Sequence, residues 1–236
     1  MTDFLVGLDV SIFRALNDFC GWSPALDRIV VNSIEILKGA LFMGIVGLLW
    51  YWPDKEMQRR RETVLTMLLV VAASLIINRT LSTLEPFRDR PMYSIGANPP
   101  SMASPWHPDL EHWSSFPSDY ATYLFAIAAS LWLISRWWGL FFGLFATLVA
   151  VARVYLGIHY PSDVLVGALI GIATSIVINR EPVRRRFAAP ILALEPRYTP
   201  YFYGLFFIGL AEISGAFQIT RRFGMAIIHL FIGFNR

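Results

Sequence analysis

The chain has 236 residues, of which 56% are hydrophobic and only 16% are charged, and its formal net charge is +3. These proportions are too apolar for an ordinary soluble domain, and the small net charge gives no support to nucleic-acid binding. Cys20 is the only cysteine, which excludes an intrachain disulfide. The apolar residues form blocks long enough to cross a bilayer as helix, which takes about 20 residues. We therefore expect an all-α, polytopic membrane helix bundle.

The first segment, residues 4–19, differs from the later apolar blocks. Its apolar side chains recur at helical spacing from Phe4 to Phe19, but Asp9, Arg14, Asn17 and Asp18 interrupt the run. This pattern predicts an amphipathic helix that lies in the membrane interface and does not span it.

About six later stretches are predicted to span the membrane: residues 25–50 (deeply apolar only over 39–52), 63–84, 118–134, 140–156, 161–178 and 201–217. Residues 85–117 between spans two and three form a Pro- and Ser-rich loop with little periodicity. The apolar tail, residues 223–234, is too short to cross. We divide the chain into a membrane core, residues 1–180, and a C-terminal extension, residues 181–236, with one additional span.

Basic residues give the expected orientation. Arg59–Arg61, Arg136 and Arg184–Arg186 follow spans one, three and five, so they share one side of the membrane. Such clusters stay cytoplasmic. The loop at 85–117 and the turn at 157–161 then share the outer face, which for a bacterial inner membrane is the periplasmic side.

Three polar clusters meet on that face, at residues 85–91, 116–120 and 153–163. Ionisable groups beside hydrocarbon are costly and point to function. Each residue also has a structural reading: Arg153 snorkels, His159 caps a turn and Asp163 caps a helix. Their convergence favours a site in which arginines bind phosphate oxygens in a bidentate way. Ser118 and the first amides of span three add donors, and a carboxylate at Asp163 that accepts one imidazole N–H leaves the other nitrogen of His159 free to attack.

This pattern resembles the type 2 phosphatidic acid phosphatase superfamily, which includes membrane undecaprenyl-diphosphate phosphatases and lipid phosphate phosphatases. The family's third motif, Ser-Arg-x5-His-x3-Asp, matches at Arg153, His159 and Asp163, with Ala152 in place of serine. The resemblance covers about residues 64–178. It implies that His159 forms a phosphohistidine, that Asp163 orients it, and that no metal or cofactor is needed. It also implies that the phosphoryl oxygens are held by Arg90, Arg153 and Ser118.

The first motif of the family, Lys-x6-Arg-Pro, has Thr83 at the lysine position. Arg79 lies one turn earlier on the same helix face, but its side chain is expected to lean towards the helix start, away from the site. Arg88 is the other candidate replacement as a phosphate ligand.

The second motif, Pro-Ser-Gly-His, has Asp119 for glycine and Tyr120 for histidine. Asp119 suits a helix start, provided that its anion points away from phosphate. By the resemblance, Tyr120 stands where the family's histidine protonates the leaving group. A phenol, with a pKa of about 10, is a weaker acid than imidazolium, at about 6.5. A phosphate leaving group needs that proton far less than an alcohol does, so we expect lipid diphosphates to be cleaved better than monophosphates.

Two loop histidines, His107 and His112, are candidate surrogate acids, with an ordinary polar loop as the simpler interpretation. With Asp109 and Glu111 they could also form a zinc site, but the spacing is weak evidence and we predict no metal.

The function predicted from sequence is hydrolysis of a lipid phosphate or diphosphate, with a polyprenyl diphosphate favoured. A phosphotransferase that passes the group to a sugar or lipid hydroxyl remains open, as does a catalytically impaired relative that binds lipid phosphate. A transporter is disfavoured, because its polar residues would extend through the bilayer. The predicted partners are the substrate lipid and membrane lipids, without nucleic acid.

Overall fold

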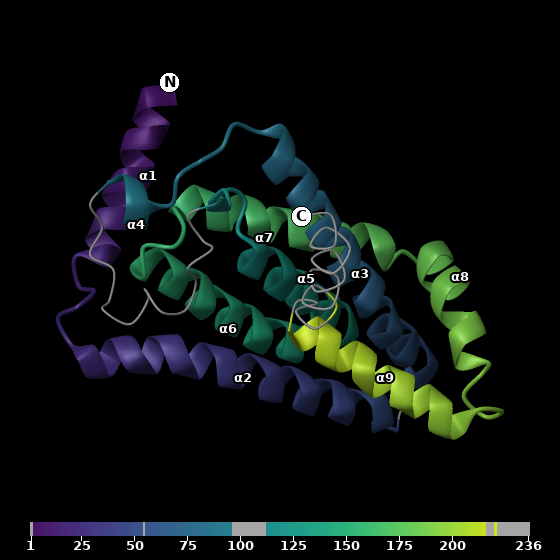
Figure 1. The fold of residues 1–236 in the computed structure, drawn as a ribbon. Coiled ribbons are helices and arrows are strands. Elements are labelled where there is room, and N and C mark those ends of the chain that lie inside the picture. Colours follow the sequence, from purple (N-terminus) through teal and green to yellow (C-terminus); the bar gives the residue numbers. More distant parts are fainter. Residues whose placement is uncertain (1, 54, 96–111, 216–219, 221–236) are drawn as a thin grey trace, which may run out of the picture.

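The computed structural model describes residues 2–53, 55–95, 112–215 and 220, and every regular element in these ranges is a helix (Figure 1). The all-α prediction is therefore confirmed. In chain order the helices are α1 (Thr2–Asn17), α2 (Pro24–Tyr51), α3 (Met57–Leu84), α4 (Pro91–Ser94), α5 (Asp119–Ile134), α6 (Arg136–Tyr155), α7 (Pro161–Ile178), α8 (Glu181–Leu192) and α9 (Thr199–Ser214).

Three of the helices described, α3, α6 and α7, are long and apolar enough to cross a membrane. Two shorter apolar helices, residues 41–51 of α2 and the whole of α5, accompany them. The predicted boundaries agree most closely for α7 and α5, whereas α3 begins earlier than predicted, at Met57. The count of six spans stays a prediction, and the apolar tail at 223–234 lies outside the described residues.

Helix α8 is not among the elements predicted from sequence, which gave this region only the basic cluster Arg184–Arg186 within the C-terminal extension. The helix begins with Pro182 in its first turn and buries Arg184, of which 8% is exposed. The Arg184 Nε donates to Glu62 Oε2 of α3 at 3.2 Å. A tertiary ion pair therefore holds this short helix in place. Its twelve residues give only a weak periodic signal from which to predict the helix.

Helix α5 occupies the centre of the bundle, packed against α3, α6 and α7. Its contact with α7 is close because α7 presents glycines there: a Cβ added at Gly167 would clash with the Ser118 carbonyl oxygen, and one at Gly171 with the Thr122 carbonyl oxygen. Buried hydroxyls strengthen the same contact, since Ser130 and Ser175 hydrogen-bond at 2.9 Å. Small residues allow such backbone approach in membrane helices. This packing fixes the starts of α5 and α7 side by side.

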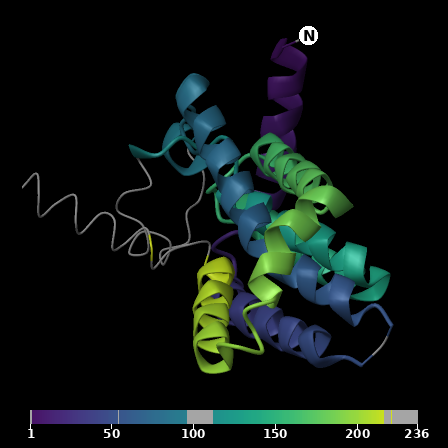
Figure 2. The same ribbon diagram turned by 90° about the vertical axis from the view of Figure 1, so that its right-hand side faces the viewer.

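The three predicted basic clusters lie at one end of the bundle. Arg59, Arg184 and Arg185 line one polar hollow there, and Arg59 also lines a second hollow with Ile134, close to Arg136. Helices α1 and α4 lie at the opposite end from α8 (Figure 1), and Figure 2 views the bundle from the side on which α8 lies. The basic loops and the motif segments therefore occupy opposite ends, as the sequence predicted.

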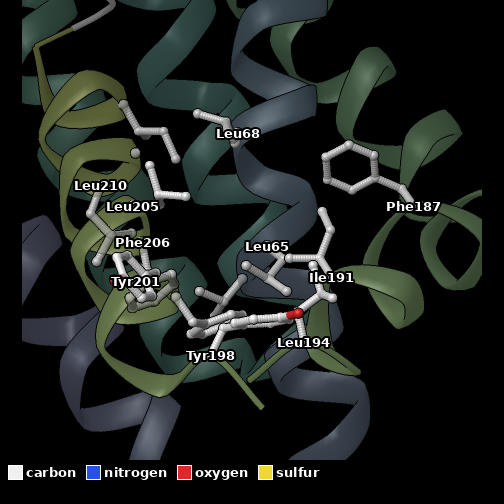
Figure 3. A pocket seen from close by; sticks show the side chains of 14 residues that line it. Leu65, Leu68, Phe187, Ile191, Leu194, Tyr198, Tyr201, Leu205, Phe206 and Leu210 are labelled. Carbon is white, nitrogen blue, oxygen red and sulfur yellow. The ribbon is translucent and has the colours of Figure 1, made fainter. Parts of the chain in front are cut away.

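An apolar groove of about 380 Å³ opens between α3, α8 and α9 (Figure 3). Leu65 and Leu68 of α3 face Phe187 of α8 and Phe206 of α9 across it. These α3 residues lie near the start of the helix, toward the basic end. The groove is therefore separate from the motif residues.

Candidate active site

Three segments far apart in the sequence are joined by backbone hydrogen bonds at the motif end. Met92 N–H donates to the Gly157 carbonyl at 2.9 Å, which ties the α4 segment to the turn between α6 and α7. Ser115 N–H donates to the Arg88 carbonyl at 2.9 Å, and Ser118 N–H to the Asp163 carbonyl at 3.0 Å. The positive φ of Gly157, 72°, lets the chain turn sharply after α6 toward His159. The three predicted polar clusters therefore converge.

His159 lies in this turn and is only 5% exposed. Its Nδ1 is 2.8 Å from the Ser115 carbonyl oxygen, which can only accept, so Nδ1 carries the hydrogen. The other nitrogen, Nε2, then keeps its lone pair, and it lies 3.5 Å from Nη1 of Arg90. Burial lowers the pKa of His159, Arg90 and Arg153 lower it further, and Asp163 opposes them. The ring is therefore neutral and oriented, as a nitrogen nucleophile must be.

Asp163 is fully buried in the first turn of α7. Its Oδ2 accepts from the Tyr160 backbone N–H at 2.8 Å and from the Ser115 hydroxyl, and lies 3.8 Å from Nδ1 of His159. The expected direct bond from imidazole to carboxylate is thus replaced by one to the Ser115 carbonyl. Asp163 acts on the ring by its charge and by holding Ser115, whose own carbonyl positions the imidazole.

Two predicted phosphate ligands flank the imidazole. Arg90 is 7% exposed and donates from Nη1 to the Ile158 carbonyl at 3.0 Å. Burial and the charge of Arg153 lower the pKa of Arg90 to about 10, so it stays cationic at neutral pH. The guanidinium of Arg153 lies 3.5 Å over the ring of Tyr120, and its buried Nε hydrogen-bonds no described residue. A cation on an aromatic face is held by the ring quadrupole, so Tyr120 positions Arg153.

Ser118 is the N-cap of α5 and is fully buried. Its hydroxyl accepts from the Ala121 N–H at 3.5 Å. With the Ser118 N–H bound to the Asp163 carbonyl, the cap and the start of α7 form one unit. The sequence placed Ser118 at the start of span three, and the structure joins it to the backbone carbonyl of Asp163 in the third motif.

Arg79, considered as a replacement for the missing lysine, has its side chain on Asp119 at the start of α5. Its Nη2 forms an ion pair with Oδ2 of Asp119, whose Oδ1 accepts from Nδ2 of Asn78 at 2.6 Å. Arg79 also lies 4.5 Å over the ring of Trp113. A long guanidinium reaches across to the neighbouring helix despite the backward tilt of its Cα–Cβ bond, because α5 starts beside this turn of α3. Asp119 is therefore directed to α3, where two donors neutralise it, and Thr83 is exposed.

Arg88 lies behind Asp163 and contacts two carboxylates. Its Nη1 donates to Oδ1 of Asp163 and its Nη2 to Oδ2 of Asp9, each at 2.6 Å. The guanidinium also stacks 4.0 Å over the ring of Tyr160. With both ends of the fork engaged by protein anions, Arg88 supports the carboxylate of the third motif, a different place from the phosphate position expected for it.

The two loop histidines are not brought into this cluster. His112 is described and exposed, and His107 lies outside the described residues. Among the residues that the structure describes, no group of three or more His, Cys, Asp or Glu side chains could hold a metal ion. The zinc alternative rested on residues 107–112, most of which are likewise outside the described part.

Sequence reasoning missed two contributors. Ser115 carries no motif signal, because its backbone carbonyl and hydroxyl act from a loop. Asp9 was interpreted as a break in the apolar pattern of the first helix. The structure buries this carboxylate, with 8% exposed, and a buried carboxylate needs a partner.

Comparison with known proteins places this fold and site in a family. The family model described as the PAP2 superfamily matches residues 63–187, which is just over half of the chain. YbjG of Escherichia coli K12 is 30% identical over 174 residues, covering 71% of this chain and 79% of YbjG. The undecaprenyl-diphosphatase BcrC of Bacillus subtilis is 29% identical over 175 residues, covering 73% of this chain and 83% of BcrC.

Among solved structures, the crystal structure of LpxE from Aquifex aeolicus superimposes with a TM-score of 0.50 and 28% identity, covering 72% of this chain and 93% of LpxE. Together with the helical membrane fold, these likenesses define an integral membrane lipid phosphatase. The chain belongs to the PAP2 superfamily.

Proposed function

We propose that this phosphatase hydrolyses a polyprenyl diphosphate at the outer leaflet through a phosphohistidine at His159. The observation that carries the proposal is the orientation of the imidazole, with Nδ1–H donated to the Ser115 carbonyl and Nε2 facing Arg90. A relative with 29% identity bears the name undecaprenyl-diphosphatase, which supports a diphosphate substrate.

In the first step the Nε2 lone pair attacks the terminal phosphorus, and the bond to the bridging oxygen breaks with its electrons remaining on that oxygen. The polyprenyl monophosphate leaves, and Arg90 and Arg153 balance the charge of the equatorial oxygens. In the second step a water oxygen bonds to phosphorus, and the P–Nε2 bond breaks with its electrons returning to Nε2. Inorganic phosphate and a proton pass to solvent, and the neutral imidazole is regenerated. Asp163 stabilises the positive charge that the ring carries in between.

Tyr120 supports the preference for a diphosphate. Its ring face is covered by Arg153, and a phenol is a weak acid at neutral pH. A leaving phosphate is a stable anion without a proton from the enzyme, whereas an alkoxide is not. The chemistry therefore favours cleavage of a phosphoanhydride over cleavage of a phosphomonoester.

The outer-leaflet assignment rests on charge. The basic residues of three loops gather at the end of the bundle opposite the site, and such loops stay cytoplasmic. A cysteine-accessibility measurement, with single cysteines introduced at Ser94 and Arg185 in a Cys20→Ser background, tests the orientation. Labelling of position 94 but not 185 by an impermeant reagent on intact cells supports it, and the reverse pattern contradicts it.

Phosphate release by the purified protein tests the reaction. We expect faster turnover of undecaprenyl diphosphate than of undecaprenyl monophosphate or phosphatidic acid, and loss of all three activities in His159→Ala. Equal rates on diphosphate and monophosphate would contradict the assigned preference. Transfer of the phosphoryl group to an added sugar or lipid alcohol in place of water would favour a phosphotransferase.

A further inference from the structure

The first helix contributes one carboxylate to the active-site end of the bundle. Asp9 of α1 accepts at Oδ1 from the Ser162 backbone N–H, 2.8 Å away, and at Oδ2 from the Ser162 hydroxyl, 2.6 Å away. Ser162 lies in the first turn of α7, immediately before Asp163. Asp9 therefore binds α7 at the position where the third motif begins, although α1 lies outside the region matched by the family model.

The same carboxylate binds the arginine that binds Asp163. Arg88 places one nitrogen on Asp9 and the other on Asp163, each at 2.6 Å. A planar guanidinium holds two carboxylates at fixed positions in this way, whereas an ammonium offers a single nitrogen on a flexible stem. The series of contacts thus runs from α1 through Arg88 to Asp163, and from Asp163 through Ser115 to His159.

Apolar packing holds α1 in the position that this series requires. Phe13, one turn after Asp9 and 1% exposed, packs its ring 5.9 Å from that of Tyr160. Tyr160 in turn lies under Arg88. Asn17, one turn further, donates to the Tyr155 carbonyl at 2.8 Å. Asp9, Phe13 and Asn17 therefore form one inward face at four-residue spacing, while Leu8 and Ile12 are exposed.

We propose that Asp9 is a positioning residue for catalysis, and that α1 is part of the catalytic unit as well as a membrane-interface helix. Asp9 keeps Arg88 between two carboxylates, and Arg88 keeps Asp163 and the Ser115 segment in the arrangement that orients His159. The inference rests on the proposed function, because it assigns Asp9 a role in a reaction at His159.

The variant Asp9→Asn tests the role in the full-length protein. Asparagine has the same size and keeps a carbonyl oxygen for the Ser162 N–H, but it removes the charge that Arg88 binds. Misplacement of a catalytic group by about 1 Å can cost about 10²-fold in rate. We therefore expect kcat on undecaprenyl diphosphate to fall about 10- to 100-fold, with KM changed little. Asp18→Asn is the matched control, since Asp18 is exposed just after the same helix.

The pH profile of kcat/KM distinguishes a positioning role of Asp9 from a purely structural contact of α1. Removing the Asp9 charge leaves Arg88 less compensated, which disfavours protonation of His159. The acid limb of kcat/KM is then expected to move to lower pH, while a purely structural contact leaves it in place. The charged groups that act on the ring are Asp163 of α7, Arg153 of α6 and Arg90 before α4. Arg88 contacts Asp163, and Asp9 of α1 contacts Arg88.

Two further variants keep the inference testable if Asp9→Asn folds poorly. Arg88→Gln removes the cation between the two carboxylates, so a parent-like kcat for this variant overturns the inference. In an Arg88→Gln background, Asp9→Asn should change kcat less than about threefold, because contacting residues are not additive. If the effects of Asp9→Asn and Arg88→Gln on kcat multiply fully in the double variant, the inference is overturned.

Assayed beside these, His159→Ala distinguishes the two proposals. If His159→Ala retains phosphate release, the proposed function and this inference both fail. If His159→Ala is inactive while Asp9→Asn matches the parent in kcat and in acid limb, only the positioning role of Asp9 is overturned.

Discussion

Replacing Gly171 by alanine tests the close contact of α5 and α7 that aligns the site. A Cβ at this position would lie 2.8 Å from the Ala126 nitrogen and would overlap the Thr122 carbonyl, and both are backbone atoms that cannot rotate away. The two helices must therefore separate. Overpacking of this kind costs about 1–3 kcal/mol, which outweighs the gain of about 0.5–1 kcal/mol that alanine brings to a helix interior.

Separation of the helices also affects catalysis, because the Ser118 N–H is bound to the Asp163 carbonyl at 3.0 Å across the same contact. A shift of about 1 Å can reduce turnover by about 10²-fold. The control is Gly143→Ala in α6, where the added Cβ would meet the Ala128 Cβ at an ordinary 4.0 Å. Thermal unfolding in detergent and phosphate release measure both effects. A Gly171→Ala protein as stable and as active as Gly143→Ala would refute the reasoning.

Three further predictions concern single side chains. Burial lowers the pKa of His159, so its folded value lies below the unfolded value of about 6.5. The stability that the neutral, buried imidazole contributes is therefore present above about pH 6.5 and is lost as the pH falls through the folded pKa. An acid limb of kcat/KM at or above about pH 6.5 would contradict this. Tyr120→His supplies a better acid, so hydrolysis of undecaprenyl monophosphate should rise about 10²-fold or more relative to the diphosphate; an unchanged ratio of the two rates would argue against a missing proton donor. Arg184→Ala removes the cation that pairs with buried Glu62 and should lower the free energy of unfolding by about 3–5 kcal/mol. Arg185→Ala removes one member of an exposed ion pair and should leave the melting temperature unchanged. Equal melting temperatures for the two variants would count against the buried pair.

The helical class and the convergence of the three motif segments followed from sequence because both depend on local patterns. Apolar blocks set the helices, and loop charges predicted that the basic clusters and the motif segments lie at opposite ends of the bundle. Arg90, Arg153 and His159 meet as their motif spacing indicated. The departures at positions 119 and 120 also acquire partners in the structure: Asp119 pairs with Arg79, and Tyr120 lies beneath Arg153.

The sequence could not predict contacts between side chains that lie far apart in the chain and follow no motif spacing. The pairing of Asp9 with Arg88 joins residues 79 positions apart, and a buried aspartate in an amphipathic helix has no periodic signature. The Ser115 contact depends on a backbone carbonyl, which any residue type supplies. Helix α8 is held by the ion pair of Arg184 with Glu62, whereas the sequence indicated only a basic cluster at Arg184–Arg186.

The contact of Arg79 shows how a tertiary partner adds to what a local rule predicts. The tilt of helical side chains predicted that it points toward the helix start, but Asp119 lies within reach on the next helix and its charge needs a partner at the end of a bundle of apolar helices. The Asp119 carboxylate is stabilised by two donors of α3, Arg79 and Asn78.

Trapping of the covalent intermediate tests the central claim most directly. Purified parent protein, quenched during turnover of undecaprenyl diphosphate labelled in its terminal phosphate, should carry acid-labile, base-stable label that maps to His159. The label should be absent from His159→Ala and should accumulate transiently in Tyr120→His as in the parent. Turnover without any label on the protein, or label on a residue other than 159, would contradict the account.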